Sequence, residues 1–216
     1  MIVMNARHDW SRVPSPSVLV AAVAFSAAVY RAVGLTLRGG SGPATLEYDD
    51  HGGSSLVLDV SESEPVLVVI DHDERQEPLQ QDTVTTALGL TTLPGMYARY
   101  DPATTYTGAA RWNGSHWSRT LGVPGLVAAD RGDDEHLLAD ASDALGEFTE
   151  GECDEVALRT LLEAVRAGDW DEDTLAAAMR CAPYEDDEEL AAAPDLRAAA
   201  DTLNEYRSLL RLMLLR

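Results

Sequence analysis

The sequence predicts an α+β fold, in which an antiparallel sheet (a meander plus a hairpin) is packed by an N-terminal helix and followed by an acidic helical C-terminal half. Three observations support this fold class. Residues 17–33 are apolar nearly throughout, residues 43–70 hold strand-like segments separated by brief turns, and residues 150–216 carry apolar side chains at helical spacing. We expect an irregular arm over residues 1–16, a sheet region over residues 17–147 and an acidic helical region over residues 148–216, packed together as one cooperative domain.

A first helix is predicted over residues 17–33, with Ser17 as its N-terminal cap and Gly34 as its stop. The segment has no polar face, which is typical of a buried helix. It also has the length of the apolar core of a signal peptide, and both interpretations stay open, although Asp9 and Trp10 ahead of it favour the buried helix. Because the stretch is too short and too rich in alanine to cross a bilayer, we expect a cytoplasmic protein without a membrane partner.

The meander is predicted from three strand-like segments: "PATLEYD" (43–49), "SLVLDV" (55–60) and "PVLVVI" (65–70). The turns between them are short, which favours antiparallel pairing. The first segment alternates polar and apolar residues, so one of its faces is expected to meet solvent. The third segment is apolar on both faces, which predicts a central strand.

The hairpin is predicted from Asn113-Gly114, the preferred pair for a two-residue type I′ turn. This register pairs Trp112 with Ser115 and Arg111 with His116, and it places Trp112 and Trp117 on one face. An anion or an aromatic ligand could bind the Arg111/His116 face, but a solvated polar face is the simpler interpretation. "GLVAAD" (125–130) and "EHLLAD" (135–140) could add two more short strands.

Two consecutive helices are predicted in the acidic region. Asp154 can cap a helix that runs to Ala167, and Asp171 can cap a second one that ends before Pro183. This helical hairpin would bring Cys153, before the first helix, near Cys181, at the end of the second. The pair is expected to be two buried thiols, with a redox contact as the alternative.

The last helix is predicted to begin near Pro194. Its apolar residues recur at alternating spacings of three and four, which is typical of a helix that packs along another helix. An oligomer could form through Leu196, Leu203, Leu210 and Met213 of this seam.

The charge of the chain is strongly negative: 37 acidic residues stand against 16 basic ones, all arginine, for a net charge of −21. Residues 41–204 hold 35 of the acids and nine of the arginines. Such a field repels phosphate, so nucleic acid is excluded as a partner, and it attracts basic proteins. The abundance of alanine and the absence of lysine are typical of a GC-rich bacterial genome, which leaves open whether the acidity is functional. The acids concentrate at Asp130–Glu135, Glu150–Glu155, Asp169–Asp173 and Glu185–Glu189.

A polar cluster, Asp71-His72-Asp73-Glu74, follows directly after the third segment of the meander. Paired carboxylates or a histidine with a carboxylate could bind Mg²⁺ or Zn²⁺, or divide acid and base roles. The simpler interpretation is a buried strand emerging into solvent, because no further ligand motif accompanies the cluster. We therefore expect no catalytic residue, no metal and no cofactor.

These observations favour an acidic, non-catalytic interaction protein of the inhibitor or immunity type, which binds and neutralises a basic protein. One alternative is a metal-dependent hydrolase that uses Asp71, His72 and Asp73. A second is a structural subunit held through its apolar first and last helices. The contact with the basic partner is expected at Asp169, Trp170, Asp171, Asp173, Tyr184, Glu185, Asp186 and Asp187.

Overall fold

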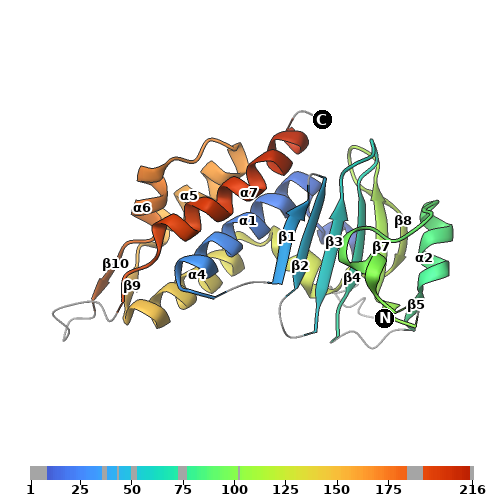
Figure 1. The fold of residues 1–216 in the computed structure, drawn as a ribbon, viewed down its shortest axis with the longest axis horizontal. Coiled ribbons are helices and arrows are strands. Elements are labelled where there is room, and N and C mark those ends of the chain that lie inside the picture. The colour runs from blue at the N-terminus through green and yellow to red at the C-terminus, as the bar shows by residue number, and fades with distance from the viewer. Residues whose placement is uncertain are drawn as a thin grey trace, which may run out of the picture. The chain divides into compact units, whose positions relative to one another are not determined.

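The computed structural model describes residues 9–35, 38–42, 44–49, 53–72, 77–101, 103–183 and 192–214. It confirms the predicted α+β class: an antiparallel sheet with a meander and a hairpin, an N-terminal helix, and a helical C-terminal half (Figure 1). The chain divides into two compact units, which we call the sheet unit (residues 1–19 and 38–132) and the helical unit (residues 20–37 and 133–216). The asparagine-glycine hairpin and the polar cluster therefore belong to the sheet unit, and both cysteines belong to the helical unit.

The sheet has the strand order β1-β2-β3-β4-β7-β8, and every neighbouring pair is antiparallel. The meander prediction is confirmed for β2, β3 and β4, which pair in sequence order. β2 alternates buried and half-buried residues, as expected for one solvated face, and β4 lies between β3 and β7, as expected for a central strand. The bounds are β1 (Arg38–Gly42), β2 (Thr45–Asp49), β3 (Ser55–Asp59), β4 (Val66–Ile70), β7 (Gly108–Trp112) and β8 (Trp117–Gly122).

The register of the β7–β8 hairpin differs from the prediction. Trp112 pairs with Trp117 and Arg111 with Ser118, so a four-residue loop replaces the two-residue turn, and the predicted pairs Trp112–Ser115 and Arg111–His116 are wrong. The reason is the Asn113 side chain, whose Oδ1 accepts hydrogen bonds from the backbone N–H groups of Ser115 (3.1 Å) and His116 (3.0 Å). The expectation that the two tryptophans share a face is confirmed, since their rings meet edge to face at 5.3 Å.

One side of the sheet unit is closed by shorter elements around a buried aromatic core. Tyr97 and Tyr106 are fully buried there with Val57, Val68 and Val84, and the two tyrosine rings lie 5.3 Å apart. Burial in this apolar core raises the pKa of Tyr97 far above its ordinary value. The elements involved are β5 (Leu79–Gln80), α2 (Gln81–Leu88), a 3-10 turn (Gly95–Arg99) and β6 (Thr105–Tyr106); a second 3-10 turn (Trp10–Arg12) precedes α1.

The two strands that the sequence suggested after the hairpin are helices instead. Residues Gly125–Ala129 form α3, and Asp134–Thr149 form α4. Asp133 is the N-terminal cap of α4. Its carboxylate accepts hydrogen bonds from the backbone N–H groups of Glu135 (3.1 Å) and His136 (3.3 Å). The buried residues of α4 include Leu137, Leu138, Ala141 and Leu145, which follow helical spacing. This spacing extends past residue 140, where the predicted strand ended.

The helical unit confirms both predicted caps. Asp154 accepts from the N–H groups of Val156 and Ala157 at the start of α5, Asp171 accepts from Thr174 N (2.7 Å) at the start of α6, and Gly168 ends α5 in the left-handed conformation. The predicted helical hairpin is therefore present. The elements of the unit are α4, α5 (Glu155–Ala167), α6 (Glu172–Ala178), the short strands β9 (Gly151–Cys153) and β10 (Cys181–Pro183), α7 (Leu196–Leu214) and most of α1 (Pro16–Ala32).

The apolar first and last helices are largely covered by the chain itself. The residues of α1 from Leu19 to Ala24 are at most 1% exposed, and on α7 Leu203, Leu210 and Met213 are buried, whereas Leu196 is 41% exposed. The backbone N–H of Asp195, just before α7, donates to the Ala32 carbonyl at the end of α1 (2.7 Å). Of the helices in the described part of the chain, none has both the length and the hydropathy that a membrane crossing requires.

Candidate functional site

The helical unit contains an acidic pocket of about 750 Å³. The C-terminal half of α4 forms one wall, β9 forms another, and the first residue of α5 completes it. Each of these elements contributes carboxylates: Asp143 and Glu147 from α4, Glu152 from β9 and Glu155 from α5. Ser142, Gly146, Gly151 and Cys153 line the rest, so the pocket has no basic lining residue.

The geometry of α4 explains why its two acids meet in this pocket. Asp143 and Glu147 are four residues apart, so they share one face of the helix, while Leu145 between them is fully buried. Glu150 then adopts the left-handed conformation (φ 52°, ψ 48°) and ends the helix. This turn directs the chain into β9, which brings Glu152 and Glu155 to the same hollow.

The pocket acids stand in an unfavourable electrostatic setting. All four are exposed, and within the described residues none of them forms an ion pair or hydrogen bond with an arginine. Like charges four residues apart on a helix repel each other. The last turn of α4 holds no basic residue, so Glu147 also lies at the negative end of the helix dipole without compensation. The charges of Asp143 and Glu147 therefore oppose folding rather than support it.

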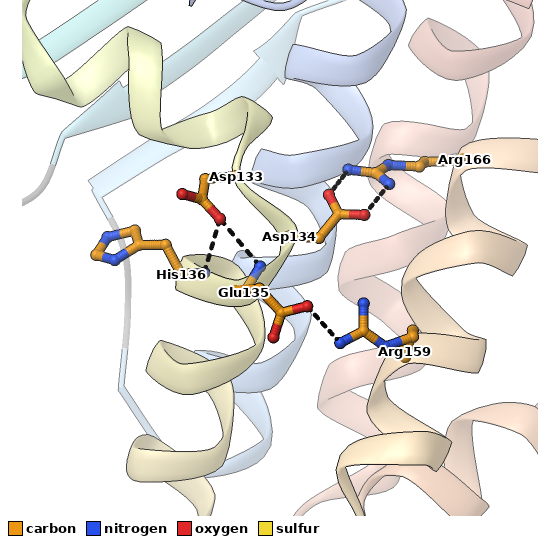
Figure 2. Close-up of polar contacts among 6 residues, drawn as sticks. All are labelled: Asp133, Asp134, Glu135, His136, Arg159 and Arg166. Carbon is orange, nitrogen blue, oxygen red and sulfur yellow. Dashed lines mark hydrogen bonds and ion pairs between the residues drawn. The ribbon is translucent and has the colours of Figure 1, made fainter. Parts of the chain in front are cut away.

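The N-terminal end of α4 is arranged in the opposite way. Asp134 accepts two hydrogen bonds from Arg166, and Glu135 Oε1 accepts one from Arg159 Nη2 at 2.8 Å, both arginines projecting from α5 (Figure 2). The Arg166 side chain lowers the pKa of the Asp134 carboxyl, and Glu135 raises the pKa of Arg159. Acids in the first turn also suit the positive end of the helix dipole. These arginines thus hold α4 and α5 together at one end and leave the pocket end uncompensated.

An apolar groove of about 360 Å³ adjoins the acidic pocket across α4. Asp143 and Glu147 line both hollows, so they form the ridge between them. Leu35, in the opposite wall of the groove, is 52% exposed. The helical unit therefore presents carboxylates and apolar side chains next to each other. The other lining residues of the groove are Tyr30, Val33, Asp140, Ala144 and Phe148.

The polar cluster after β4 has a structural explanation at its first residue. Asp71 is only 4% exposed, and its Oδ2 accepts a hydrogen bond from Leu126 N at 2.7 Å, which holds the start of α3. Gly125 has a φ of +65°, and a Cβ at this position would lie 2.2 Å from Asp71 Oδ2, so the contact requires glycine. The Asp71 carboxylate therefore has a structural role, because it links the end of β4 to the start of α3.

The other members of that cluster contribute less. His72 is exposed, and its backbone N–H donates to Ser54 Oγ at 3.3 Å, while Asp73 and Glu74 lie outside the described residues. In the described part of the chain, no three histidine, cysteine, aspartate or glutamate side chains are grouped as a metal site would require. Because Asp73 lies outside the described residues, the hydrolase hypothesis stays a prediction.

The predicted Arg111/His116 face does not form a shared surface. Arg111 is 6% exposed, its Nε donates to the Leu88 carbonyl at 2.7 Å, and its Nη1 bonds Glu62 Oε2 at 3.3 Å. His116 lies in the hairpin loop, where its ring contacts Asn113 Nδ2 at 3.1 Å. Arg111 is therefore engaged with protein groups, and a ligand would have to displace them.

The structure describes four of the eight predicted partner-binding residues, all at the α5–α6 turn. Asp169 and Asp173 are exposed at the α5–α6 turn, and Asp171 caps α6. Trp170 is only 7% exposed, with the Arg207 guanidinium 4.7 Å from its ring centre, so its indole belongs to the interior of the helical unit and is not an exposed anchor. Tyr184, Glu185, Asp186 and Asp187 lie outside the described residues.

Sequence reasoning did not single out the pocket acids Asp143 and Glu147. The signal that could have found them is their spacing of four residues in a segment without a lysine or arginine, but residues 135–140 were interpreted as a strand. The other two, Glu152 and Glu155, belong to the recognised acidic segment Glu150–Glu155. Only the fold shows that both pairs face one hollow.

Comparisons of the chain with protein families, characterised proteins and solved structures returned no match. The function is therefore argued from the residues of this chain alone.

Proposed function

We propose that this chain is a non-catalytic, acidic interaction protein of the inhibitor or immunity type, which binds and neutralises a basic protein. The observation that carries the proposal is the acidic pocket: four exposed carboxylates from three elements, with no arginine among the lining residues. We place the contact there rather than at the α5–α6 turn, because that turn lacks an exposed aromatic residue and the pocket offers a hollow.

Electrostatics supports a basic partner over a neutral one. Residues 133–216 contain 23 acidic residues and seven arginines, so the whole helical region attracts cations before contact. An arginine of the partner could donate two parallel hydrogen bonds to one carboxylate, a bidentate arrangement that a lysine cannot reproduce. A basic partner would also offset the repulsion between Asp143 and Glu147. The unfavourable free energy of this repulsion in the unbound chain would then add to the driving force for binding.

The neighbouring groove supports a protein partner over a small cation. Interfaces owe most of their binding energy to a few buried apolar or aromatic anchors surrounded by polar contacts. The groove has an apolar wall containing Val33, Leu35 and Phe148, and it shares Asp143 and Glu147 with the acidic pocket. A basic segment with an apolar side chain next to an arginine would fit both hollows at once.

The test is a binding comparison of two variants that lose the same charge. In the pocket variant, Asp143→Asn, Glu147→Gln, Glu152→Gln and Glu155→Gln neutralise the lining acids. In the control variant, Glu163→Gln, Asp169→Asn, Glu172→Gln and Asp173→Asn neutralise four exposed acids elsewhere in the helical unit. Fluorescence anisotropy with an arginine-rich peptide that carries leucine and phenylalanine measures both, at two salt concentrations.

We expect the pocket variant to bind the peptide at least about tenfold more weakly and the control variant to stay within about threefold of the wild type, because contact charges count for more than distant ones. A larger loss in the control variant would move the binding surface to the α5–α6 turn, where the sequence alone had placed it. Equal losses in both variants would reduce the interaction to net charge and overturn the pocket assignment.

The two alternative hypotheses remain predictions with simple measurements. A hydrolase using Asp71, His72 and Asp73 would retain stoichiometric metal through gel filtration and lose it on Asp71→Ala. A structural subunit would form an oligomer whose mass does not change with salt. The proposed interaction protein is a monomer whose binding to the basic peptide weakens steeply with salt.

A further inference from the structure

The two cysteines of the chain face each other directly across a pair of short strands. Cys153 in β9 is the register partner of Cys181 in β10, as the helical hairpin between them led us to expect (Figure 1). The two other pairs in this ladder are Glu152–Ala182 and Gly151–Pro183.

Pro183 shows whether the cysteine pair is a hydrogen-bonded or a non-hydrogen-bonded pair of the ladder. Residues opposite each other in an antiparallel ladder alternate between hydrogen-bonded and non-hydrogen-bonded pairs. Pro183 has no N–H, so the Gly151–Pro183 pair is of the non-hydrogen-bonded type, and Cys153–Cys181, two residues along, is of the same type. In such pairs the Cα atoms lie about 4.5 Å apart, which is at the short end of the range that disulfides span. A disulfide here can therefore form with little backbone movement.

The two thiols differ in access to solvent. Cys181 is buried (6% exposed), whereas Cys153 is half-buried and lines the acidic pocket. Cys153 Sγ donates a weak hydrogen bond to the Ser142 carbonyl at 3.8 Å. Burial, followed by the hydrogen bond with Cys181, raises the pKa of Cys153 to about 12. Cys153 is therefore a protonated thiol at neutral pH, and it is the more accessible of the two, at the pocket wall.

We propose that Cys153 and Cys181 form a reversible disulfide that joins β9 to β10 at the wall of the acidic pocket. The oxidant is a small-molecule disulfide of the glutathione class. Cys153 loses its proton and attacks one sulfur of the oxidant, whose S–S bond breaks and releases one thiol. Cys181 then loses its proton and attacks the sulfur of Cys153, which releases the second thiol. Two protein thiols are thus oxidised to one disulfide, and the small disulfide is reduced to two thiols.

Solvent access at one of its two sulfurs makes this link reversible rather than permanent. Exposed disulfides are reduced more readily than shielded ones. The half-buried Cys153 gives a reductant a sulfur to attack, whereas Cys181 is shielded. The link is independent of the proposed function, since it concerns the strands and not the identity of the partner.

The experiment equilibrates the wild-type chain in mixtures of oxidised and reduced glutathione and then quenches it with a thiol-alkylating reagent. Intact-mass spectrometry counts the free thiols. Trypsin cleaves after Arg131, Arg159, Arg180 and Arg197, so Cys153 and Cys181 fall on separate peptides that only a disulfide can join. We expect a single monomeric species with joined peptides under excess oxidised glutathione, and full return to two thiols under excess reduced glutathione.

A Cys181→Ala variant provides the matched control, with circular dichroism to show that it is folded. Without its partner, Cys153 should accumulate as a mixed disulfide with glutathione, at least about tenfold more than in the wild type, where the second cysteine resolves that intermediate. Wild-type chain that keeps both thiols free, that stops at the mixed disulfide, or that forms only disulfide-linked dimers under oxidising conditions would overturn the proposal. Because the wild type alone gives these outcomes, a poorly folded variant would not obscure the result.

Discussion

The two ends of α4 use acidic residues for opposite purposes. At its N-terminal end, Asp134 and Glu135 are paired with arginines of α5 and lie at the favourable end of the helix dipole. At its C-terminal end, Asp143 and Glu147 face a hollow with two further carboxylates and no arginine. The first arrangement stabilises the helical unit and the second does not. Acids that fail to support the fold are therefore the ones to examine for a role in binding.

The largest expected change in stability concerns the pocket end. Oxidation of Cys153 and Cys181 would close a loop of about 28 residues, which by chain entropy stabilises the folded state by about 3.6 kcal/mol, less any strain. Urea unfolding of the oxidised and the reduced wild type measures the difference. A lower midpoint for the oxidised form would mean that strain in the β9–β10 link exceeds the entropic gain.

The chemistry of the same link predicts how its formation depends on pH. Because the pKa of Cys153 is raised to about 12, its reactive thiolate is scarce at neutral pH and increases with pH. The rate of oxidation by glutathione disulfide should therefore rise about tenfold per pH unit from about pH 7 to about pH 9. Stopped-time alkylation measures this rate, and a rate that is flat over this interval would show a thiol of much lower pKa.

A smaller loss of stability is expected when the N-terminal end of α4 is disrupted. Arg166→Ala removes both hydrogen bonds to Asp134 and should lower the free energy of unfolding by about 1–2 kcal/mol, since the pair is charged but partly open to solvent. Urea unfolding checks the value. Asp143→Ala is the matched change at the other end and should cost little, because the pocket carboxylates support no contact in the described residues.

Acid should weaken the N-terminal end in a defined direction. Arg166 lowers the pKa of Asp134 below its ordinary value of 3.8, so this carboxylate stabilises the fold above that pH and the contribution is lost as the pH falls through the lowered pKa. Between about pH 5 and about pH 2.5, the wild type should lose more stability than an Asp134→Asn variant. Parallel losses in the two proteins would show that the pair is not linked to folding.

The smallest expected effect is a gain in stability. Glu147→Gln removes a repulsion with Asp143 and a negative charge from the C-terminal end of α4, so unfolding should require about 0.3–1 kcal/mol more free energy. Thermal or urea unfolding at low salt measures the gain, which should shrink at high salt. A stable variant that has also lost affinity for the basic peptide would show most directly that this charge serves binding and not folding.

Several elements could be predicted because their determinants are local. Asp154, Asp171 and Gly168 are short-range signals for helix ends, and they act in the structure as expected. The apolar run of residues 65–70 likewise predicted a central strand. The proximity of Cys153 and Cys181 followed from the helical hairpin that separates them.

The hairpin register, the role of Asp71 and the burial of Trp170 were not predicted. Each depends on a contact that the local sequence pattern does not reveal. The Asn113 side chain accepts two backbone hydrogen bonds, and this interaction outweighs the preference of Asn-Gly for a two-residue turn. Asp71 looked like a residue reaching solvent, but α3, which begins some fifty positions later, supplies the N–H group that binds its carboxylate. The sequence predicted Trp170 as an exposed anchor, but in the structure the Arg207 guanidinium of α7 lies over its ring.

The α+β class, the helix caps and the excess of negative charge can be predicted from the amino-acid sequence, because periodicity, capping and charge are properties of neighbouring residues and of composition. Which acids are compensated and which are not becomes visible in the folded chain. Ion pairing depends on which arginine lies within a few ångströms of which carboxylate, and that distance is set by the packing of α4 against α5 and β9. The acidic pocket and the facing thiols are both products of that packing.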